Sequence, residues 1–547
     1  TVFGAQNVYV YNASRPYNEN VVLLPDTTLW GSGSLIPGYG GKTFGSGIHP
    51  VVDGLSLGPA ITMADRTTVR GMSVRNTDLG GPDQMVILPN LPTYNVRRVG
   101  IYGDDATDLT LLDNVAMGNE IGVLLGRAGD FNLTYRNNLA VRNDVDGMEI
   151  WANGGGGGLF NADVSGSVFN ENGGSGLLLV ASDYDGSFVR IRDSQAMYNS
   201  VIGFESIQQN SSFAMSLLSG LNAHGNVIGI EQVQVGNDVA LANISGSAAN
   251  DNTGLGIQNV QNSDFVSVGV IGMPDGMDTL AAGLASLIGF PLPAEVGMFL
   301  SPSGPVTANN NGLGVQSVVT ADSGLALGAL FDVTANGNGA FGIQAINQSA
   351  NGVAVGLAGS SQNLAEILQL GDNVAGLFGL DLPLSIPGDG HMEANGNGMG
   401  GFMMQTTGND AAINAVVGLD TLGNGDFGTM LGTYSDGLAL SALARLNSAD
   451  NGGAGLLFEA YGLNTGAIGV LADVSAVGNG DSGITASIDS PNGIAALLTL
   501  STDALRPAAA ILGETFLGAP FTLPGASFGP VVASGNTGNG FTAVVTG

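Results

Sequence analysis

Arginine and carboxylate side chains gather in one part of the sequence, where they could carry out sugar chemistry. Glycoside hydrolysis needs two carboxylates flanking the sugar, and arginines would neutralise an acidic sugar. The arginines are Arg127, Arg136, Arg142, Arg190 and Arg192, and the acids are Asp144, Asp146, Glu149, Asp183, Asp185 and Asp193. Ordinary charge pairing on a solvated face explains the same residues without catalysis. We therefore predict no catalytic residue, and the chain is expected not to be an enzyme.

Acidic turns are a second possible source of chemistry, because calcium prefers oxygen ligands. The weak candidates for calcium ligands are Asp144, Asp146, Asp183 and Asp185, each close to a turn glycine. Calcium-binding nonapeptide repeats need an array of G-G-x-G-x-D turns, which this sequence lacks. The absence of cysteine also excludes thiolate metal sites and cysteine nucleophiles. No cofactor is expected.

Charge excludes several kinds of partner. The chain has 46 acidic and 14 basic residues, a formal net charge of −32, and only 11% charged residues in all. Nucleic acids and anionic membrane surfaces would repel such a protein. No stretch of about 20 residues is continuously apolar and free of proline, so we expect no transmembrane segment. The 89 glycines and many asparagines instead favour a repetitive fold.

A repeat runs through four-fifths of the chain and must position these side chains. Its unit is an asparagine, three residues, a glycine and then an apolar alternation. The asparagines are Asn143, Asn172, Asn199, Asn252, Asn310, Asn338, Asn397, Asn424, Asn451, Asn479 and Asn536, with shorter copies at Asn119 and Asn226. Most of the steps between successive repeat glycines lie within two residues of 27, for example from Gly176 to Gly203.

The repeat predicts an all-β fold, a right-handed parallel β-helix. Alternation with period two indicates strands, as in 257–260. Three short strands and three turns fill one unit, so each rung has three strands and about 27 residues. The rule for crossovers between parallel strands favours a right-handed coil. We expect the asparagines to form a ladder of stacked amides, and the glycines to allow positive φ at a sharp corner.

The opening rungs resemble a known family. Tyr9-Val10-Tyr11-Asn12, residues 17–24 and Leu29-Trp30-Gly31-Ser32-Gly33 are similar to the first rungs of bacterial right-handed parallel β-helix repeat proteins, which share the pectate-lyase-like superfold. That family includes secreted and autotransporter-type passengers, so the resemblance implies an extracellular or cell-surface location. Residues 1–115 are expected to form rungs with long loops, and 116–547 to continue the same solenoid with regular repeats.

Three double-length steps hold three similar inserts, at about 271–304, 358–390 and 501–529. Each leaves the rung after its second strand, begins with a short helix-like apolar pattern and ends with an apolar segment containing proline. One interpretation is a flap that covers an apolar face of the coil; the other is a lateral contact surface between copies. The candidate contact residues are Leu284, Leu287, Phe290, Leu382, Leu384, Phe521 and Leu523.

The sequence as a whole favours a structural role. We expect a self-assembling fibre subunit or surface adhesin, whose copies stack head to tail by pairing their edge strands. The last strand, around Phe541 and Val544, has no capping segment in sequence, so either the next rung belongs to another copy or the natural chain continues beyond Gly547. In the first case these two residues are the predicted assembly residues. A cell-surface glycan or protein is a further expected partner. The alternative is a secreted protein that binds or acts on polysaccharide at a shallow lateral site near residues 127–193.

Overall fold

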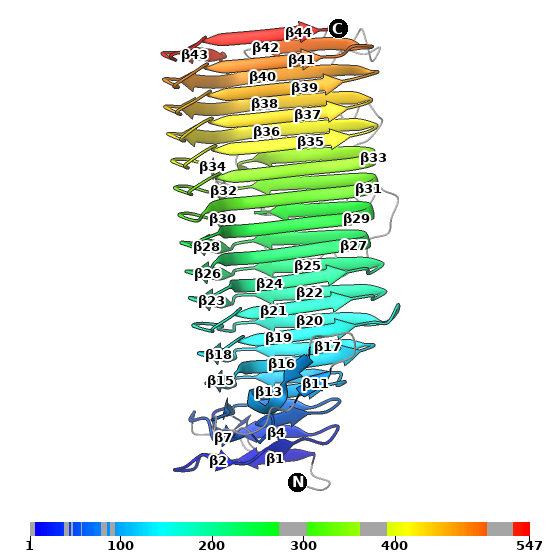
Figure 1. Ribbon diagram of the computed structural model, residues 1–547, viewed down its shortest axis with the longest axis vertical. Coiled ribbons are helices and arrows are strands. Elements are labelled where there is room, and N and C mark those ends of the chain that lie inside the picture. The colour runs from blue at the N-terminus through cyan, green and yellow to red at the C-terminus, as the bar shows by residue number, and fades with distance from the viewer. Residues whose placement is uncertain are drawn as a thin grey trace. The chain divides into compact units, whose positions relative to one another are not determined.

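The computed structural model describes residues 6–34, 36–37, 43–44, 47–55, 57–77, 85–87, 93–272, 303–361, 391–499 and 529–547. The chain forms two compact units. Unit 1 consists of residues 1–240 and 248–254, and unit 2 of residues 241–247 and 255–547. Each unit is a right-handed parallel β-helix, which confirms the fold predicted from the repeat (Figure 1). The boundary that the sequence indicated near residue 115 stays a prediction.

One turn of unit 1 shows how the repeat becomes a rung. Strands β21 (Leu177–Ser182), β22 (Gly186–Arg192) and β23 (Gln195–Met197) follow one another along the chain. The next turn places Phe204 opposite Leu177, Phe213 opposite Gly186 and Asn222 opposite Gln195. Each of these partners is 27 residues further on, so the repeat length is the length of one turn.

Three parallel sheets run through unit 1. The first contains β3 (Val21–Val22), β8 (Ile61–Met63), β13 (Val99–Asp104), β16 (Ile121–Ala128), β19 (Met148–Asn153), β21, β24 (Ile202–Gln209) and the first part of β27 (Ile228–Ser245). The second contains β1 (Asn7–Val10), β4 (Thr28–Gly31), β9 (Thr68–Arg70), β14 (Leu109–Leu112), β17 (Phe131–Arg136), β20 (Leu159–Ser165), β22 and β25 (Phe213–Ser219).

The third sheet of unit 1 has the shortest strands. It contains β2 (Tyr17–Asn18), β7 (Val51–Asp53), β10 (Ser73–Arg75), β15 (Val115–Met117), β18 (Leu139–Val141), β23, β26 (Asn222–His224) and β28 (Ala248–Asn250). Outside the three sheets lie two antiparallel pairs and a short 3-10 helix: β5 (Ile36–Pro37) with β6 (Thr43–Phe44), β11 (Met85–Ile87) with β12 (Thr93–Asn95), and η2 (Val96–Arg98).

Unit 2 repeats the same plan with longer strands that bend from one sheet into the next. Its strands are β29 (Leu255–Ile271), β30 (Val306–Thr307), β31 (Leu313–Phe331), β32 (Val333–Thr334), β33 (Ile343–Gly359), β34 (Met392–Glu393), β35 (Phe402–Gly408), β36 (Ala411–Leu422), β37 (Thr429–Ser435), β38 (Leu438–Ala449), β39 (Leu456–Gly462), β40 (Gly466–Val477), β41 (Ile484–Asp489), β42 (Ile494–Thr499), β43 (Val532–Ser534) and β44 (Phe541–Thr546). The final turn consists of β42, β43 and β44. Both β42 and β43 pair with the long strand β40, and β44 pairs with β41.

Buried asparagines form the predicted ladder in both units. In unit 1, the Asn199 side-chain oxygen accepts hydrogen bonds from the backbone N–H (3.1 Å) and the side-chain amide (2.9 Å) of Asn172. The Asn199 amide in turn donates to Asn226, 3.1 Å away, and Asn226 donates to Asn252. The members with a recorded bond to the next rung are Asn119, Asn143, Asn172, Asn199, Asn226, Asn311, Asn338, Asn397, Asn424, Asn451 and Asn479, and the last of these bonds reaches Asn536.

The prediction that Asn310 belongs to the ladder is wrong. Asn310 is exposed and has a left-handed backbone (φ 57°), whereas its buried neighbour Asn311 donates to Asn338. The sequence has three consecutive asparagines here, and only the register shows that this rung is one of the shorter copies. The residue before the ladder asparagine takes the left-handed conformation in other rungs as well, including Arg142, Glu171 and Tyr198.

The repeat glycines are needed for a different reason from the one predicted. Gly203 and Gly147 do not have positive φ, because the left-handed corner lies just before the ladder asparagine. A Cβ on Gly203 would instead lie 2.5 Å from the carbonyl oxygen of Gly229 and 3.0 Å from the Asn226 amide nitrogen. Glycine therefore recurs because the next rung passes too close for any side chain.

The three predicted inserts fall largely outside the described residues. These gaps, 273–302, 362–390 and 500–528, each follow a strand of the second sheet: β29, β33 or β42. The candidate contact residues Leu284, Leu287, Phe290, Leu382, Leu384, Phe521 and Leu523 all lie in these gaps. The helical character of the inserts and their role in lateral contacts stay predictions.

Candidate functional site

The arginines and acids singled out in the sequence form ion pairs between neighbouring rungs of unit 1. Asp163 on β20 lies between Arg136 of the rung before and Arg192 of the rung after, at 2.5 and 2.9 Å. Burial alone would raise the pKa of Asp163, but hydrogen bonds from Arg192 and Arg136 hold that pKa below its usual value. The carboxylate is therefore charged and satisfied at neutral pH, which suits a structural role.

The remaining members of the group are also engaged in bonds or lie apart. Arg142 binds Glu171 at 2.7 Å and Arg127 binds Asp105 at 2.8 Å. Among the predicted calcium ligands, Asp144 pairs with Arg98, Asp146 accepts from the Ser175 backbone N–H, and Asp183 accepts from Asn153 at 2.8 Å, whereas Asp185 makes a backbone bond to Gly158. Asp193 occupies a left-handed corner. The described residues contain no group of three or more His, Cys, Asp or Glu side chains that could hold a metal ion.

A column on the first sheet of unit 1 contains three carboxylates, of which only Glu149 was singled out in the sequence. The outward positions of successive strands place Glu149, Leu178, Glu205 and Glu231 in line. Burial raises the pKa of Glu205 to about 7, helped by the charges of Glu231 and Asp146. Burial also raises the pKa of Glu231. These acids lie 26 or more residues apart in sequence, so only the register of the rungs brings them together.

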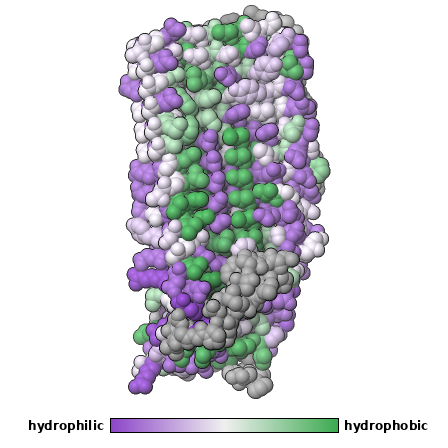
Figure 2. Space-filling model, viewed as in Figure 1, coloured by the Kyte–Doolittle hydropathy of each residue, from purple (hydrophilic) through white to green (hydrophobic). Residues whose placement is uncertain are grey.

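Apolar columns flank this polar one. Outward-facing Val180, Ile207 and Val233 stack two residues further along the same strands of unit 1. The equivalent residues of unit 2 are Val260, Val318 and Ile346, which run beside a glutamine ladder formed by Gln258, Gln316 and Gln344. Figure 2 shows hydrophobic columns on both sides of a hydrophilic one on this face.

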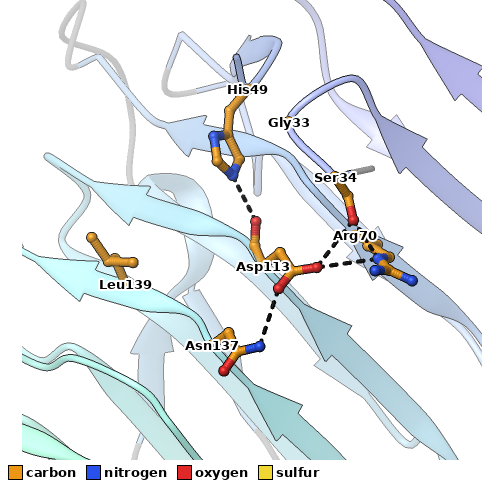
Figure 3. A pocket seen from close by; sticks show the side chains of 7 residues that line it. All are labelled: Gly33, Ser34, His49, Arg70, Asp113, Asn137 and Leu139. Carbon is orange, nitrogen blue, oxygen red and sulfur yellow. Dashed lines mark hydrogen bonds and ion pairs between the residues drawn. The ribbon is translucent and has the colours of Figure 1, made fainter. Parts of the chain in front are cut away.

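A polar pocket lies elsewhere in unit 1, at the corner between its second and third sheets. It is about 350 Å³ in volume and is lined by Gly33, Ser34, His49, Arg70, Asp113, Asn137 and Leu139 (Figure 3). Asp113 and Asn137 follow β14 and β17 at the same corner of successive rungs, with φ of 55° and 54°. Aspartate and asparagine tolerate this left-handed backbone better than most residues.

Asp113 hydrogen-bonds to four of the other residues that line the pocket. Its carboxylate accepts hydrogen bonds from Ser34 Oγ at 3.0 Å, from Arg70 Nε at 3.2 Å and from Asn137 Nδ2 at 3.3 Å. Its backbone carbonyl lies 2.7 Å from His49 Nε2, so that nitrogen carries the proton and donates it. Arg70 also lies over the Trp30 ring, with its guanidinium carbon 5.0 Å from the ring centre. The charges of Arg70 and Asp113 cancel within the site.

This pocket was not predicted from the sequence. His49 lies in a loop and is 64 residues from Asp113, so their contact does not show in the local sequence. Gly33 is the one local signal, because a Cβ there would come within 2.5 Å of the His49 ring. That contact depends on where the loop crosses the rungs. Ser34 donates to the Asp113 carboxylate, which also accepts from Arg70.

The end of unit 2 contains the two predicted assembly residues. Phe541 follows Ile484 in register and lies on the inner side of its strand, whereas Val544 follows Ser487 on the outer side. Phe541 is 41% exposed and Val544 is 53% exposed. The two predicted assembly residues, Phe541 and Val544, therefore lie on opposite sides of β44.

No protein-family model matches the chain, and neither does any curated protein sequence. Among solved structures, a DFA-IIIase mutant from Arthrobacter chlorophenolicus A6 is similar over 77% of this chain and 85% of that one. Its sequence identity is 10% and its TM-score 0.27. A similarity at that TM-score carries no argument about function. Within the part of the chain that the structure describes, no helix is long and apolar enough to cross a lipid bilayer.

Proposed function

We propose that the chain is a non-catalytic structural protein of the cell exterior or surface, whose copies join end to end into a fibre. The observation that supports the proposal is the regular stacking of rungs, in which charged side chains singled out in the sequence pair with neighbouring rungs, as Asp163 does with Arg136 and Arg192. Phe541 and Val545 continue two inward-facing columns whose preceding members, Ile484 and Ile488, are fully buried. On β44, however, Phe541 is 41% exposed and Val545 is 45% exposed. Exposed apolar core positions favour burial against another surface.

The backbone of the final turn supports the same proposal. Each of β42, β43 and β44 pairs with an earlier strand on one edge, and none has a recorded partner on its other edge among the described residues. An unpaired edge of a parallel sheet is a template for a further strand. A second chain that adds strands there would gain main-chain hydrogen bonds as well as apolar contact.

The test uses one charged substitution on each side of β44. Val545→Asp places a carboxylate among the inner apolar residues, and Val544→Asp, the matched control, places it on the outer side of the same strand. We expect wild type and Val544→Asp to form filaments visible by negative-stain electron microscopy, and Val545→Asp to remain monomeric in analytical ultracentrifugation. A wild-type protein that stays monomeric at every concentration, or equal assembly of both variants, would contradict the proposal.

Lateral association through the three inserts belongs to the same proposal. Deleting one insert should leave single filaments that no longer bundle. A cell-surface glycan or protein as a further partner is proposed with the adhesin role, and whole-cell binding by the purified filament is its test.

The second candidate function is action on, or binding of, polysaccharide at a lateral site near residues 127–193. The observation that favours it is the carboxylate column that begins at Glu149 in this region and continues beyond it to Glu205, since an acid with a pKa of about 7, as at Glu205, suits a general acid. Release of reducing sugar from a panel of polysaccharides, lost in Glu205→Gln but kept in Glu171→Gln, would support it. Glu171 is a suitable control because it lies in an exposed ion pair.

A further inference from the structure

An exposed asparagine–glycine pair lies in a turn of unit 2. Residues 490–493, Ser-Pro-Asn-Gly, connect β41 to β42, and the Gly493 N–H donates to the Ser490 carbonyl across the turn. This hydrogen bond is 3.3 Å long, whereas such bonds are usually about 2.9–3.0 Å. Asn492 is exposed, and no hydrogen bond of its side chain is recorded within the described part of the chain. The Asn492 side-chain amide and the Gly493 backbone nitrogen are therefore only weakly held.

The packing of this corner requires glycine at position 493. A Cβ there would lie 2.6 Å from the Thr465 carbonyl oxygen and 2.7 Å from Ser490 Oγ. One of these neighbours is backbone, and the other belongs to a fully buried residue, so neither can easily move away. Because glycine has no Cβ, its nitrogen is also open to an approaching group. Close packing thus places an unhindered nitrogen directly after an unrestrained asparagine.

The same dipeptide recurs in the buried ladder, where both groups are held. Asn424 is 2% exposed, donates to Asn451 at 2.9 Å, and accepts from the backbone and the side chain of Asn397. The Gly425 N–H donates to the Asn397 carbonyl at 2.8 Å. Reaction between this nitrogen and the Asn424 side chain would require these bonds to open first.

A third pair shows that exposure and restraint are separate properties. Asn351 is exposed, but its Nδ2 donates to the Asp322 carbonyl at 3.1 Å. Asn351 and Gly352 also lie within β33, where they pair with Ser323 and Gly324 of β31. The pair at Asn351 is therefore accessible to water and yet fixed by a neighbouring rung.

We propose that Asn492 is a site of spontaneous deamidation, at which the protein modifies itself with water as the only co-reactant. The Gly493 nitrogen loses its proton and bonds to Asn492 Cγ, the Cγ–Nδ2 bond breaks, and Nδ2 leaves as ammonia. Water then opens the resulting cyclic succinimide at one of its two carbonyls. The products are aspartate and isoaspartate, and no oxidant or reductant is consumed.

The modification acts on the strand that follows. Isoaspartate carries the backbone through its side-chain carbon, so the chain between residues 492 and 493 becomes one atom longer. β42 begins directly afterwards, where Ile494 pairs with Gly466 of β40. The extra atom should loosen this pairing, and both products add a negative charge to an already acidic chain. This inference does not depend on the fibre role.

The experiment incubates the folded full chain at physiological temperature and pH. Peptic digestion and mass spectrometry then measure deamidation at each asparagine, and enzymatic methylation detects isoaspartate. The pairs at Asn351 and Asn424 are internal comparisons in the same sample. Asn492→Gln is the matched control variant, because it keeps an exposed amide but must close a larger ring. A parallel sample unfolded in urea gives the rate of each pair without the fold.

We expect Asn492 to deamidate at least about tenfold faster than Asn351 and Asn424 in the folded protein, the factor that corresponds to an opening free energy of about 1.4 kcal/mol at the protected pairs. In urea the three rates should converge, and Asn492→Gln should remove the isoaspartate signal of its peptide. Equal rates at the three pairs in the folded protein, or no reaction at Asn492 while the unfolded chain reacts, would overturn the proposal.

Discussion

Removing one amide from the ladder should cost several kilocalories per mole. Asn199 is 2% exposed, and its side chain takes part in four hydrogen bonds. It accepts from the Asn172 backbone and side chain at 3.1 and 2.9 Å, and donates to the Phe169 carbonyl at 2.8 Å and to Asn226 at 3.1 Å. Asn199→Ala removes all four and leaves buried donors and acceptors behind. At about 1 kcal/mol for each bond, the expected loss is about 4 kcal/mol.

The loss should be local, because each rung of a solenoid contacts mainly its neighbours. Native-state hydrogen exchange followed by mass spectrometry is therefore the assay, since one global unfolding curve is not meaningful for such a protein. Amides of β21 and β24, the strands on either side of the ladder position, should exchange roughly a thousandfold faster, which corresponds to about 4 kcal/mol. Amides of β39 and β41 in unit 2 should keep their wild-type rates.

Asn132→Ala is the matched control. Asn132 also hydrogen-bonds to side chains of the neighbouring rungs, Asp108 at 3.2 Å and Asn161 at 2.9 Å, but it is exposed. Water replaces those bonds, so its substitution should change stability by less than about 1 kcal/mol. Equal effects of the two variants would refute the conclusion that the buried ladder holds successive rungs together.

Three further outcomes follow from the same structure. Gly203→Ala should destabilise unit 1, because its Cβ would lie 2.5 Å from the carbonyl oxygen of Gly229. The control Gly157→Ala should be tolerated, because the nearest atom to its Cβ would be 3.8 Å away. Thermal unfolding followed by circular dichroism compares the two variants. Asp163 has a lowered pKa, so its contribution to stability is complete above its unfolded-state pKa and is lost as pH falls through the folded value. Asp163→Asn should therefore be less stable than wild type at neutral pH in urea titrations, with the difference shrinking in acid. Glu205 has a raised pKa of about 7, so its contribution is complete below its unfolded-state pKa and is lost as pH rises toward and past 7. Glu205→Gln should gain stability relative to wild type between about pH 5 and pH 8, and parallel urea curves over that range would contradict the burial of this acid.

Several features of the fold could be predicted from the sequence because they depend on spacing alone. Corners that recur about every 27 residues require one turn of a coil per repeat, and alternation with period two requires strands. The buried amide ladder follows as well, since equivalent residues of a parallel coil must stack. The expected position of Asn310 was wrong because a run of three asparagines does not reveal which one faces inward.

Two features could be decided only from the three-dimensional structure: the role of the repeat glycines and the sides of β44 on which Phe541 and Val544 lie. The role of the repeat glycines depends on how closely the next backbone passes, and that distance is not a property of the local sequence. The inner or outer side of Phe541 and Val544 depends on the register of β44 with β41. A shift of one residue would exchange the two sides.

The sequence by itself determined that this protein is built of repeated three-stranded turns with few charged residues, because periodicity and composition are read along one dimension. Only the tertiary structure decided which distant side chains meet. It placed Glu205 beside Glu231, and it brought His49 from a loop to the corner that contains Asp113. The physical reason is that these contacts run across the rungs, between residues whose separation along the chain depends on loop paths and register, and neither is encoded in a local pattern.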